Sequence, residues 1–352
     1  MDIRAVAIVA LFACTGLQAA WRVDLAEWGY KPPPPRAVRE AGAVRFLDFD
    51  SHNQVLAGFV VRAEDPLATS TDPGLILHVV AFDPDGKFLS DRQFPATSRY
   101  QNQIFATSSG NLLLATDQVL RLISPDGKVL AQRDLPRDWW RLWAAPDRTR
   151  FWFKNLVVLD AKDLTTVAEC SYPDHRVDSI SAHNTFLALY KSNSFSHPTE
   201  VRAFCGSTQF TYVASQGEPS DGTLLDDDRV VLAYGDPMVE LIDRGVRLWR
   251  DSLDKRHERI GDHISVDTHG DRFAVLVDTY QGGIRFLDIS STLKSKRVIV
   301  YNAKDGKHLV EVPIPKLPKF FLDFALSPDG KLLAIKCDGE LQVVAVDRPQ
   351  PE

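Results

Sequence analysis

The chain has 352 residues, of which 44% are hydrophobic and 25% are charged, so it has ample material for a globular core. Its formal net charge of -6 excludes a general electrostatic attraction to nucleic acid or to an anionic bilayer, and we expect no nucleic-acid partner. The length allows two average domains or one large β architecture.

Residues 1–20 have the layout of a secretory signal peptide. A short charged start precedes a mostly apolar run from Ala5 to Leu17, and residues 18–20 offer small side chains for cleavage. The run is shorter than the ~20 residues that span a bilayer, so we expect no transmembrane segment. We predict a periplasmic or secreted protein. A buried N-terminal strand or helix is one alternative. A lipid anchor through Cys14 is another, because residues 11–14 resemble a bacterial lipobox.

Residues 21–352 are predicted to form a single domain. The stretch 21–30 alternates like an outer β-strand, and the proline-rich stretch 31–42 is expected to be a stiff extended connector. From 43 to 315, one phrase of four strands recurs six times with a period of about 40 residues, which is typical of propeller blades. One example is QIFATSSGNLLLAT followed by VLRLISPDGKVLAQRDLP, in which Gly, Asn, Asp and Pro mark the turns.

The stretch 320–347 supplies only three strands of a seventh unit, so its last strand would be an exposed edge. Pairing residues 21–28 with 341–346 would complete this unit and close the ring. We therefore predict an all-β fold, a seven-bladed β-propeller closed by an N-terminal strand. A β-sandwich or two stacked barrels are the alternatives, but neither requires a recurring four-strand phrase.

The repeated phrase resembles the WD40-like and YVTN-type seven-bladed propellers of bacterial secreted proteins. The resemblance rests on LSPDGKLLAI at 326–335 and on VIVYNAKDGKHLVEVPIP at 298–315, and the phrase covers nearly all of the mature chain. The Gly-His and Trp-Asp dipeptides of true WD40 repeats are missing. The resemblance therefore implies the fold and leaves the activity open, because propellers host both enzymes and binding platforms.

Three cysteines remain after residue 20, and each lies alone in a strand-like run: Cys170, Cys205 and Cys337. An odd number cannot pair completely within one chain, so the pattern favours buried free thiols. A disulfide between Cys170 and Cys205 is the alternative.

Motifs of catalysis and metal binding are absent from the sequence. We find no Gly-x-Ser-x-Gly, Gly-x-Gly-x-x-Gly or Walker-type loop, and the histidines at 257, 263 and 269 are too widely spaced for a shared metal. Three acidic stretches, at 83–86, 124–127 and 226–228, are interpreted as hairpin turns rather than calcium loops. We predict no catalytic residue, no metal site and no cofactor.

The three longest insertions fall at 62–74, 191–199 and 279–296, each between the second and third strands of a unit. In a propeller these insertions share a face with the connectors between blades, and long loops on a rigid scaffold are common sites of function. Arg and aromatic residues of those connectors suit binding hot spots, although they could instead pair with Asp or pack between blades. The predicted binding residues are Arg99, Tyr100, Trp140, His175, Arg176, His257 and Arg259.

We predict a non-catalytic, monomeric, exported propeller that binds a protein, peptide or glycan through this face. The mixture of Arg and aromatic residues suits an anionic or sugar-like ligand. The alternative is a propeller hydrolase or oxidoreductase with its site at the mouth of the central channel.

Overall fold

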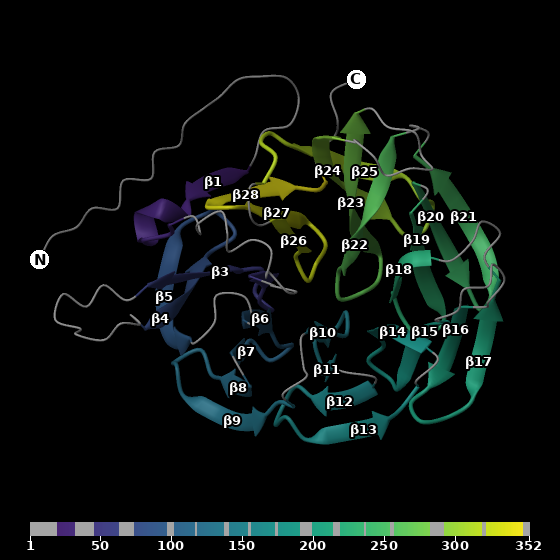
Figure 1. Ribbon diagram of the computed structural model, residues 1–352, viewed down its shortest axis with the longest axis horizontal. Helices are drawn as coiled ribbons and strands as arrows, with labels where there is room; N and C mark the ends of the chain where they lie inside the picture. The colour runs from purple at the N-terminus through teal and green to yellow at the C-terminus, as the bar shows by residue number, and fades with distance from the viewer. Residues whose placement is uncertain are drawn as a thin grey trace, which may run out of the picture.

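The chain folds into a ring of seven four-stranded antiparallel sheets, which we call blades 1 to 7 (Figure 1). This computed structural model describes residues 20–31, 46–62, 74–96, 102–116, 118–136, 141–153, 156–172, 175–190, 199–213, 219–235, 237–253, 257–281, 292–318 and 322–347. The prediction of an all-β, seven-bladed β-propeller is confirmed.

Blades 1 to 6 each contain four strands that are consecutive in the chain. Blade 1 is β2 (Leu47–Phe49), β3 (Val55–Arg62), β4 (Leu75–Phe82) and β5 (Phe88–Ala96). Blade 2 is β6 (Asn102–Ala106), β7 (Leu112–Thr116), β8 (Val119–Ile123) and β9 (Val129–Asp134). Blade 3 is β10 (Leu142–Ala144), β11 (Arg150–Phe153), β12 (Leu156–Asp160) and β13 (Thr166–Cys170).

The second half of the ring repeats this plan. Blade 4 is β14 (His175–Ile180), β15 (Thr185–Tyr190), β16 (Thr199–Ala203) and β17 (Thr208–Tyr212). Blade 5 is β18 (Pro219–Leu224), β19 (Arg229–Tyr234), β20 (Met238–Asp243) and β21 (Val246–Ser252). Blade 6 is β22 (Glu258–Val266), β23 (Arg272–Gln281), β24 (Thr292–Asn302) and β25 (His308–Ile314). Blade 7 has β26 (Leu322–Leu326), β27 (Leu332–Cys337) and β28 (Glu340–Ala345) from the end of the chain.

The ring is closed by β1 (Trp21–Asp24), which pairs antiparallel with β28, and Figure 1 shows the purple β1 beside the yellow β28. The predicted closing segment is a strand only as far as Asp24. Its carboxylate accepts a hydrogen bond from the Ala26 backbone N–H at 2.9 Å, and the chain turns into a short 3-10 helix, η1 (Leu25–Trp28). The next stretch, 32–45, lies outside the described residues, so the prediction of a stiff connector there stays a prediction.

Residues 20–31, which we call the N-terminal clasp, also hold blade 1. The Trp21 indole N–H donates to the Pro84 carbonyl at 2.9 Å, and its ring fills the space beside Gly86, where a Cβ atom would lie 2.7 Å from it. Trp28 lies against Phe82, with ring centroids 5.3 Å apart. The clasp therefore joins the last blade by backbone hydrogen bonds and the first blade by aromatic packing.

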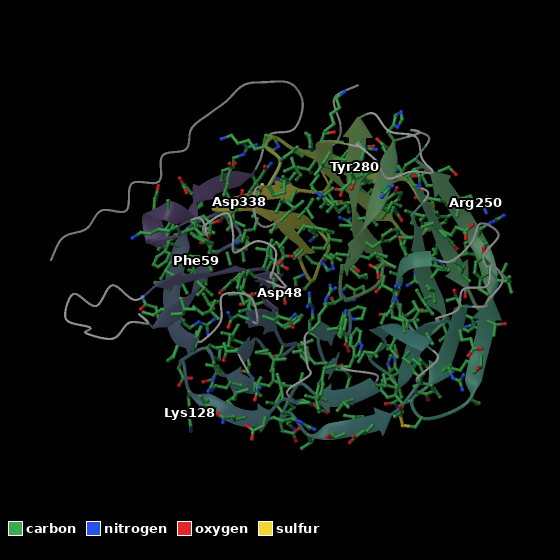
Figure 2. The ribbon with its side chains drawn as sticks, in the orientation of Figure 1. Asp48, Phe59, Lys128, Arg250, Tyr280 and Asp338 are labelled. Atoms are coloured by element: carbon green, nitrogen blue, oxygen red, sulfur yellow. A yellow bond between two sulfur atoms is a disulfide. The ribbon has the colours of Figure 1, made fainter. Side chains whose placement is uncertain are left out.

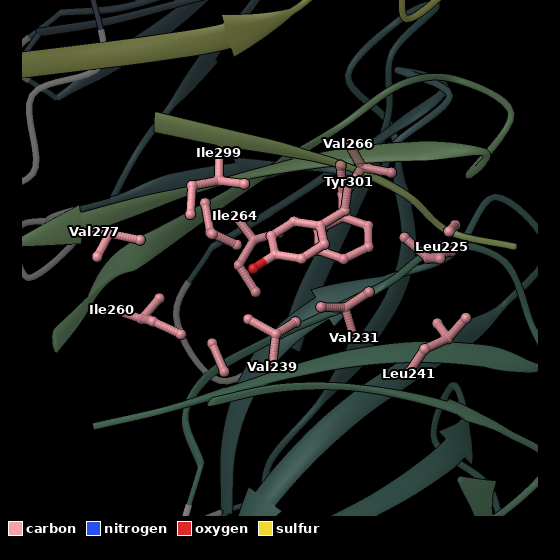
Figure 3. Packing of buried hydrophobic residues seen from close by; sticks show 14 of the residues in the cluster. Leu225, Val231, Val239, Leu241, Ile260, Ile264, Val266, Val277, Ile299 and Tyr301 are labelled. Atoms are coloured by element: carbon pink, nitrogen blue, oxygen red, sulfur yellow. The ribbon is translucent and has the colours of Figure 1, made fainter. Parts of the chain in front are cut away.

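The hydrophobic core lies between neighbouring blades. Figure 3 shows one such interface, where Val231 and Leu241 of blade 5 face Val277 and Tyr301 of blade 6. Strands that are covered on both faces have continuous apolar runs, as in β7, whose five residues are all buried. The outermost strand has one solvent-facing side, and β9 accordingly alternates between exposed and partly buried residues.

Cys170 and Cys205 form a disulfide, with Cα atoms 5.4 Å apart. It joins β13 of blade 3 to the turn between β16 and β17 of blade 4, and the sulfur atoms are visible at the rim in Figure 2. The prediction of buried free thiols was wrong for these two residues, because the two runs become neighbours only when blades 3 and 4 pack. Cys337 is free, as predicted.

Candidate binding face and channel mouth

All three predicted insertions leave the ring on the face where the innermost strands begin. They join β3 to β4, β15 to β16 and β23 to β24. Antiparallel register places the start of each inner strand beside the end of the second strand, as in the pairs His175↔Tyr190 and Glu258↔Thr279. We call this side the long-loop face. Residues 63–73, 191–198 and 282–291 lie outside the described residues, but the strand ends that bound them are described.

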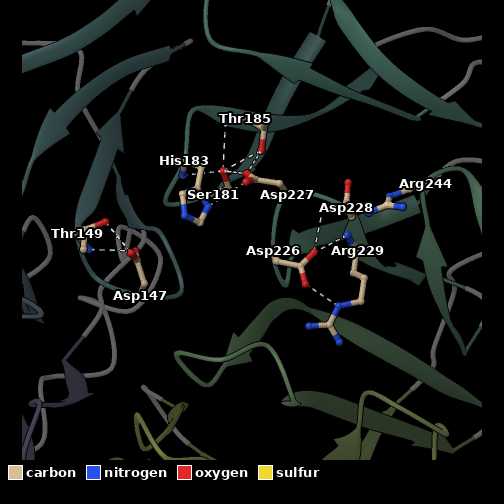
Figure 4. A network of polar contacts seen from close by, with 10 residues as sticks. All are labelled: Asp147, Thr149, Ser181, His183, Thr185, Asp226, Asp227, Asp228, Arg229 and Arg244. Atoms are coloured by element: carbon tan, nitrogen blue, oxygen red, sulfur yellow. Dashed lines mark hydrogen bonds and ion pairs between the residues drawn. The ribbon is translucent and has the colours of Figure 1, made fainter.

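The opposite side, the short-turn face, carries tight turns held by their own polar side chains. Ser181 Oγ accepts hydrogen bonds from the backbone N–H groups of His183 and Thr185, at 3.1 and 3.2 Å. Asp226, at the equivalent turn of blade 5, accepts from the Asp228 and Arg229 backbones (Figure 4). The acidic stretch at 226–228 is therefore a turn, as predicted.

One cluster on the short-turn face contains Ser, His and Asp side chains, but not as a catalytic relay. Ser181 donates its hydroxyl hydrogen bond to Asp227, and His183 Nδ1 lies 2.9 Å from the same carboxylate (Figure 4). In a catalytic triad the nucleophilic hydroxyl donates to the imidazole, and the carboxylate accepts from the other nitrogen of that imidazole. Here the Asp227 carboxylate contacts both Ser181 and His183, so the cluster is a structural network.

Several polar residues of the inner strands have a structural role between blades. Gln103 Oε1 accepts from the Leu142 N–H at 2.7 Å, and Asp323 Oδ2 accepts from the Phe46 N–H at 2.9 Å. Similar bonds cross three further junctions at 2.9 to 3.0 Å, from Ala106 to Asp48, from Leu224 to Ser179 and from Leu326 to Ser265. Each bond satisfies a backbone group that faces the central axis.

Asp48 is also ion-paired. It lies near the centre of the ring in Figure 2, is fully buried, and accepts a hydrogen bond from Arg148 Nη2 at 2.8 Å. Arg148 belongs to the first turn of blade 3 on the short-turn face, so its side chain reaches across to blade 1. Breaking such a buried pair costs about 3–5 kcal/mol, which marks this pair as part of the scaffold.

The structure describes only part of the predicted binding set. Arg99, Tyr100 and Trp140 lie outside the described residues, and His175 is described only as backbone. His257 is exposed, and its carbonyl accepts from the Tyr280 N–H at 2.8 Å. The Arg259 guanidinium lies over the Tyr280 ring, 5.3 Å from its centroid. His257 and Arg259 are therefore at the start of β22 and Arg176 at the start of β14, all on the long-loop face.

Arg176 is held by an aspartate that the sequence analysis did not single out. Its Nε and Nη2 atoms donate to the two carboxylate oxygens of Asp178, at 2.5 and 2.7 Å, and Nη2 also donates to the Ser220 carbonyl at 2.8 Å. The Asp178 side chain is only 4% exposed. The bidentate fork fixes the guanidinium in one orientation at the junction of blades 4 and 5.

Two further charged residues belong to this group, Asp221 of blade 5 and Arg141 of blade 3. Burial and then the charge of Asp178 raise the pKa of Asp221 to about 8. Burial also raises the pKa of Asp178, and the charges of Arg141 and Arg176 oppose the rise in the pKa of both carboxyls. We call these four residues the charged cluster: Arg141, Arg176, Asp178 and Asp221. The sequence does contain a signal for the two carboxyls. Asp178 in VDSIS and Asp221 in SDGTL are charged residues among apolar or small ones.

Bulges in two adjacent inner strands shape this cluster. The β14–β15 register shifts between Val177 and Ser179, and the β18–β19 register shifts between Pro219 and Asp221. A bulge redirects the side chain of the extra residue and is frequent beside functional sites. Asp178 is the extra residue of β14.

Neither a metal site nor a membrane-spanning helix is found in the described ranges. No three His, Cys, Asp or Glu side chains among those residues gather as metal ligands. No helix in the same ranges is long and apolar enough to cross a bilayer.

Comparison with known proteins shows the fold class. No family model matches the chain, and no curated protein matches it. A chain in the crystal structure of the mitotic checkpoint complex is similar over 98% of this chain and 99% of that chain, with a TM-score of 0.57 and 12% identity. The C-terminal WD40 domain of Sif2 has a TM-score of 0.46 and 13% identity, over 95% of this chain and 99% of that one. The likeness to the first of these chains agrees with the β-propeller fold of this chain, and at 12% identity it concerns the fold alone.

Proposed function

We propose that this protein is a non-catalytic binding propeller that holds a protein or peptide partner on its long-loop face. One observation carries the proposal: the strand ends that bound all three long insertions lie on the same face as the cationic starts of the inner strands. The opposite face has short, self-capped turns. Loops on a rigid scaffold, with Arg and aromatic residues beside them, are the usual composition of an interaction surface.

A polypeptide is the favoured partner class among those the sequence allows. WD40 propellers commonly mediate protein interactions, and the similar chain was crystallised as part of a complex, the mitotic checkpoint complex. That likeness concerns the fold, so it supports the class of partner and not its identity.

We also propose that the protein is exported after removal of residues 1–20. The apolar segment 5–17 and the resemblance to YVTN-type secreted propellers support export. The Cys170–Cys205 disulfide supports it independently, because disulfides persist in oxidising compartments and are rare in the cytosol. N-terminal sequencing of the protein from a cell fraction tests this, and an acylated Cys14 terminus would replace it with a lipid anchor.

The binding proposal is tested by two matched triple variants in partner capture. The first changes Arg176, His257 and Arg259 to Ala on the long-loop face. The second changes three cations of the short-turn face to Ala: Arg244, Lys307 and Lys331, with side chains 73%, 78% and 67% exposed. We expect capture to be lost only with the first variant, while both retain the parent's circular dichroism spectrum. Loss with the second variant alone would refute the choice of face.

A further inference from the structure

The outer turn of blade 1, between β4 and β5, is covered by an indole from the preceding blade. Trp21 of the clasp donates its indole N–H to the Pro84 carbonyl at 2.9 Å. Its ring lies on Gly86, where a Cβ atom would be 2.7 Å away, and against Phe82, with ring centroids 5.6 Å apart. The contact therefore combines a hydrogen bond at the ring edge with packing on a bare backbone.

The outer turn of blade 6, between β24 and β25, is covered in the same way. Trp249 of blade 5 donates its indole N–H to the Ala303 carbonyl at 2.9 Å. Its ring lies on Gly306, where a Cβ atom would be 2.8 Å away, and against Tyr301, with ring centroids 6.0 Å apart. The chain thus uses one docking geometry at two junctions, from blade 7 to blade 1 and from blade 5 to blade 6.

The outer turn of blade 2, between β8 and β9, has the same backbone as the turn of blade 1. Both turns read Pro-Asp-Gly-Lys, at 84–87 and at 125–128. Gly86 and Gly127 have φ angles of 88° and 89°, and each donates its N–H to the residue before the proline, at 3.0 and 2.9 Å. The Pro125 carbonyl and the face of Gly127 are therefore shaped to receive an indole.

Ser90 of β5 occupies the place that an indole has at the other two junctions. It pairs with Ala81, which belongs to the hydrophobic cluster between blades 1 and 2, and directly paired residues point to the same face of a sheet. Trp249 likewise pairs with Leu241 of the cluster between blades 5 and 6. In β5 and β21 alike, the residue comes directly after a bulge. Ser90 therefore faces blade 2 but is too short to cover its outer turn.

The turn of blade 2 is accordingly open. Among the described residues, no atom lies within 4 Å of the position that a Cβ atom on Gly127 would take. All six residues from 125 to 130 are exposed, and Figure 2 shows Lys128 of this turn at the rim of the ring. The turn thus presents to solvent the surface that its counterparts use for an indole.

A separate polypeptide is the source of an indole that fits these observations. The other tryptophans of the described residues pack within the chain, Trp28 on Phe88 at 5.7 Å and Trp143 on Trp152 at 5.6 Å between ring centroids. A second copy of the chain would have to give up one of these contacts. Tryptophan is also a frequent anchor in protein interfaces, because it buries a large ring and donates one hydrogen bond.

We propose that the outer turn of blade 2 is a docking site for a tryptophan side chain of a partner polypeptide. The indole N–H donates to the Pro125 carbonyl, and the ring lies on Gly127. Three apolar residues beside Ser90 and the turn are available to the partner: Leu89, Val129 and Leu130, which are 43%, 48% and 49% exposed. The site lies on the rim, apart from the long-loop face, so it goes beyond the proposed function.

The test uses a small peptide and reads the turn directly. Protein labelled with 15N at glycine and lysine is titrated with acetyl-Ala-Trp-Ala-amide, and the assigned backbone amides are followed by NMR. The Gly127 and Lys128 signals should move and saturate. The Gly86 and Gly306 signals should stay in place, because indoles of the chain already cover those turns. The same peptide with Leu in place of Trp should leave all four signals unchanged.

Two variants and one control make the response specific. Ser90→Trp supplies the indole from within the chain, so it should weaken peptide binding at least about tenfold. Gly127→Asn, read at Lys128, should do the same, because Asn tolerates a positive φ and its Cβ atom blocks the ring. Ser207→Trp adds an indole at the exposed outer turn of blade 4, and it should leave binding within about twofold.

A peptide with 1-methyltryptophan tests the hydrogen bond. This side chain keeps the ring but cannot donate to the Pro125 carbonyl, so the peptide should bind more weakly than the tryptophan peptide. Equal binding of the two peptides would overturn the assignment of the hydrogen bond.

The inference as a whole has its own refuting outcomes. A Gly127 signal that does not move up to the solubility limit of the peptide would overturn it, as would equal movement with the Leu peptide or full binding to Ser90→Trp. Movement of that signal with protein concentration alone, together with a dimer in sedimentation, would assign the turn to a second copy and overturn the partner. None of these measurements uses the long-loop face, so the proposed function stands or fails separately in partner capture.

Discussion

The Cys170–Cys205 disulfide provides a quantitative test of how the rim of the ring is stabilised. It joins residues 35 positions apart in the sequence and connects two blades that also share a hydrophobic cluster, including Trp152 of blade 3 and Phe186 of blade 4. Replacing Cys205 with Ser removes the cross-link at an exposed position, so the substitution leaves no cavity in the core. The loss of stability should therefore come mainly from the unfolded chain, which becomes less constrained.

The magnitude follows from the length of the loop. For about 35 residues, the loop-closure entropy is about 13 cal/mol/K, which corresponds to about 4 kcal/mol at 25 °C. Engineered disulfides often stabilise by less than this value, because the unfolded state keeps some structure. We expect Cys205→Ser to lower the free energy of unfolding by about 2–4 kcal/mol.

Urea denaturation followed by tryptophan fluorescence measures this loss, with the parent protein in oxidising buffer as the reference. The parent with added reductant should move toward the unfolding midpoint of the variant, and the variant should not respond to reductant. Cys337→Ser is the matched control, because Cys337 is free and its replacement should change stability little. Equal midpoints for parent and variant, or an equal loss for the two substitutions, would refute the cross-link.

Three further changes test the clasp and the charged cluster. Leu25→Ala should lower the free energy of unfolding by about 2–5 kcal/mol in chemical denaturation, because Leu25 is fully buried. Arg22→Ala on the same clasp should change it by less than about 0.5 kcal/mol, because Arg22 is exposed. Gly339→Ala would place a Cβ atom 2.5 Å from the Tyr30 ring, so the substitution should displace that ring. We expect the free energy of unfolding to fall by about 1–3 kcal/mol. An unchanged near-UV circular dichroism spectrum would contradict the displacement. The folded-state pKa of Asp221 lies above its unfolded value of about 4, so the parent should lose stability as pH rises from about 4 to about 8. Asp221→Asn should remove that part of the pH dependence in thermal melts, and parallel pH profiles of the two proteins would refute the raised pKa.

Much of the fold could be predicted because the blade is a local unit. The turn at 326–335 is an example: Ser327 accepts the Leu332 N–H, and Gly330 adopts a positive φ of 69° that glycine tolerates best. Such turns depend on a few neighbouring residues, so each unit shows its four strands in its own sequence. Closure by residues 21–24 was also predictable, since three strands at the end of the chain left one edge unpaired.

The candidate site was only partly predictable. Topology places Arg176, His257 and Arg259 on one face, because the order of strands determines where each connector emerges. Nothing in the periodicity indicated that Arg176 binds Asp178, because a bulge displaces Asp178 from the regular alternation of β14.

By itself, the sequence determined the number of blades, the strand that closes the ring and the positions of the insertions, because these follow from short-range turn chemistry and from the need to pair every inner strand. Tertiary structure alone decided the disulfide and the charged cluster. The cysteines come from blades 3 and 4, and the cluster joins blades 3, 4 and 5. Their proximity and the raised pKa of Asp221 arise from blade-to-blade packing, which removes water and brings carboxyls together, and no single repeat encodes that arrangement.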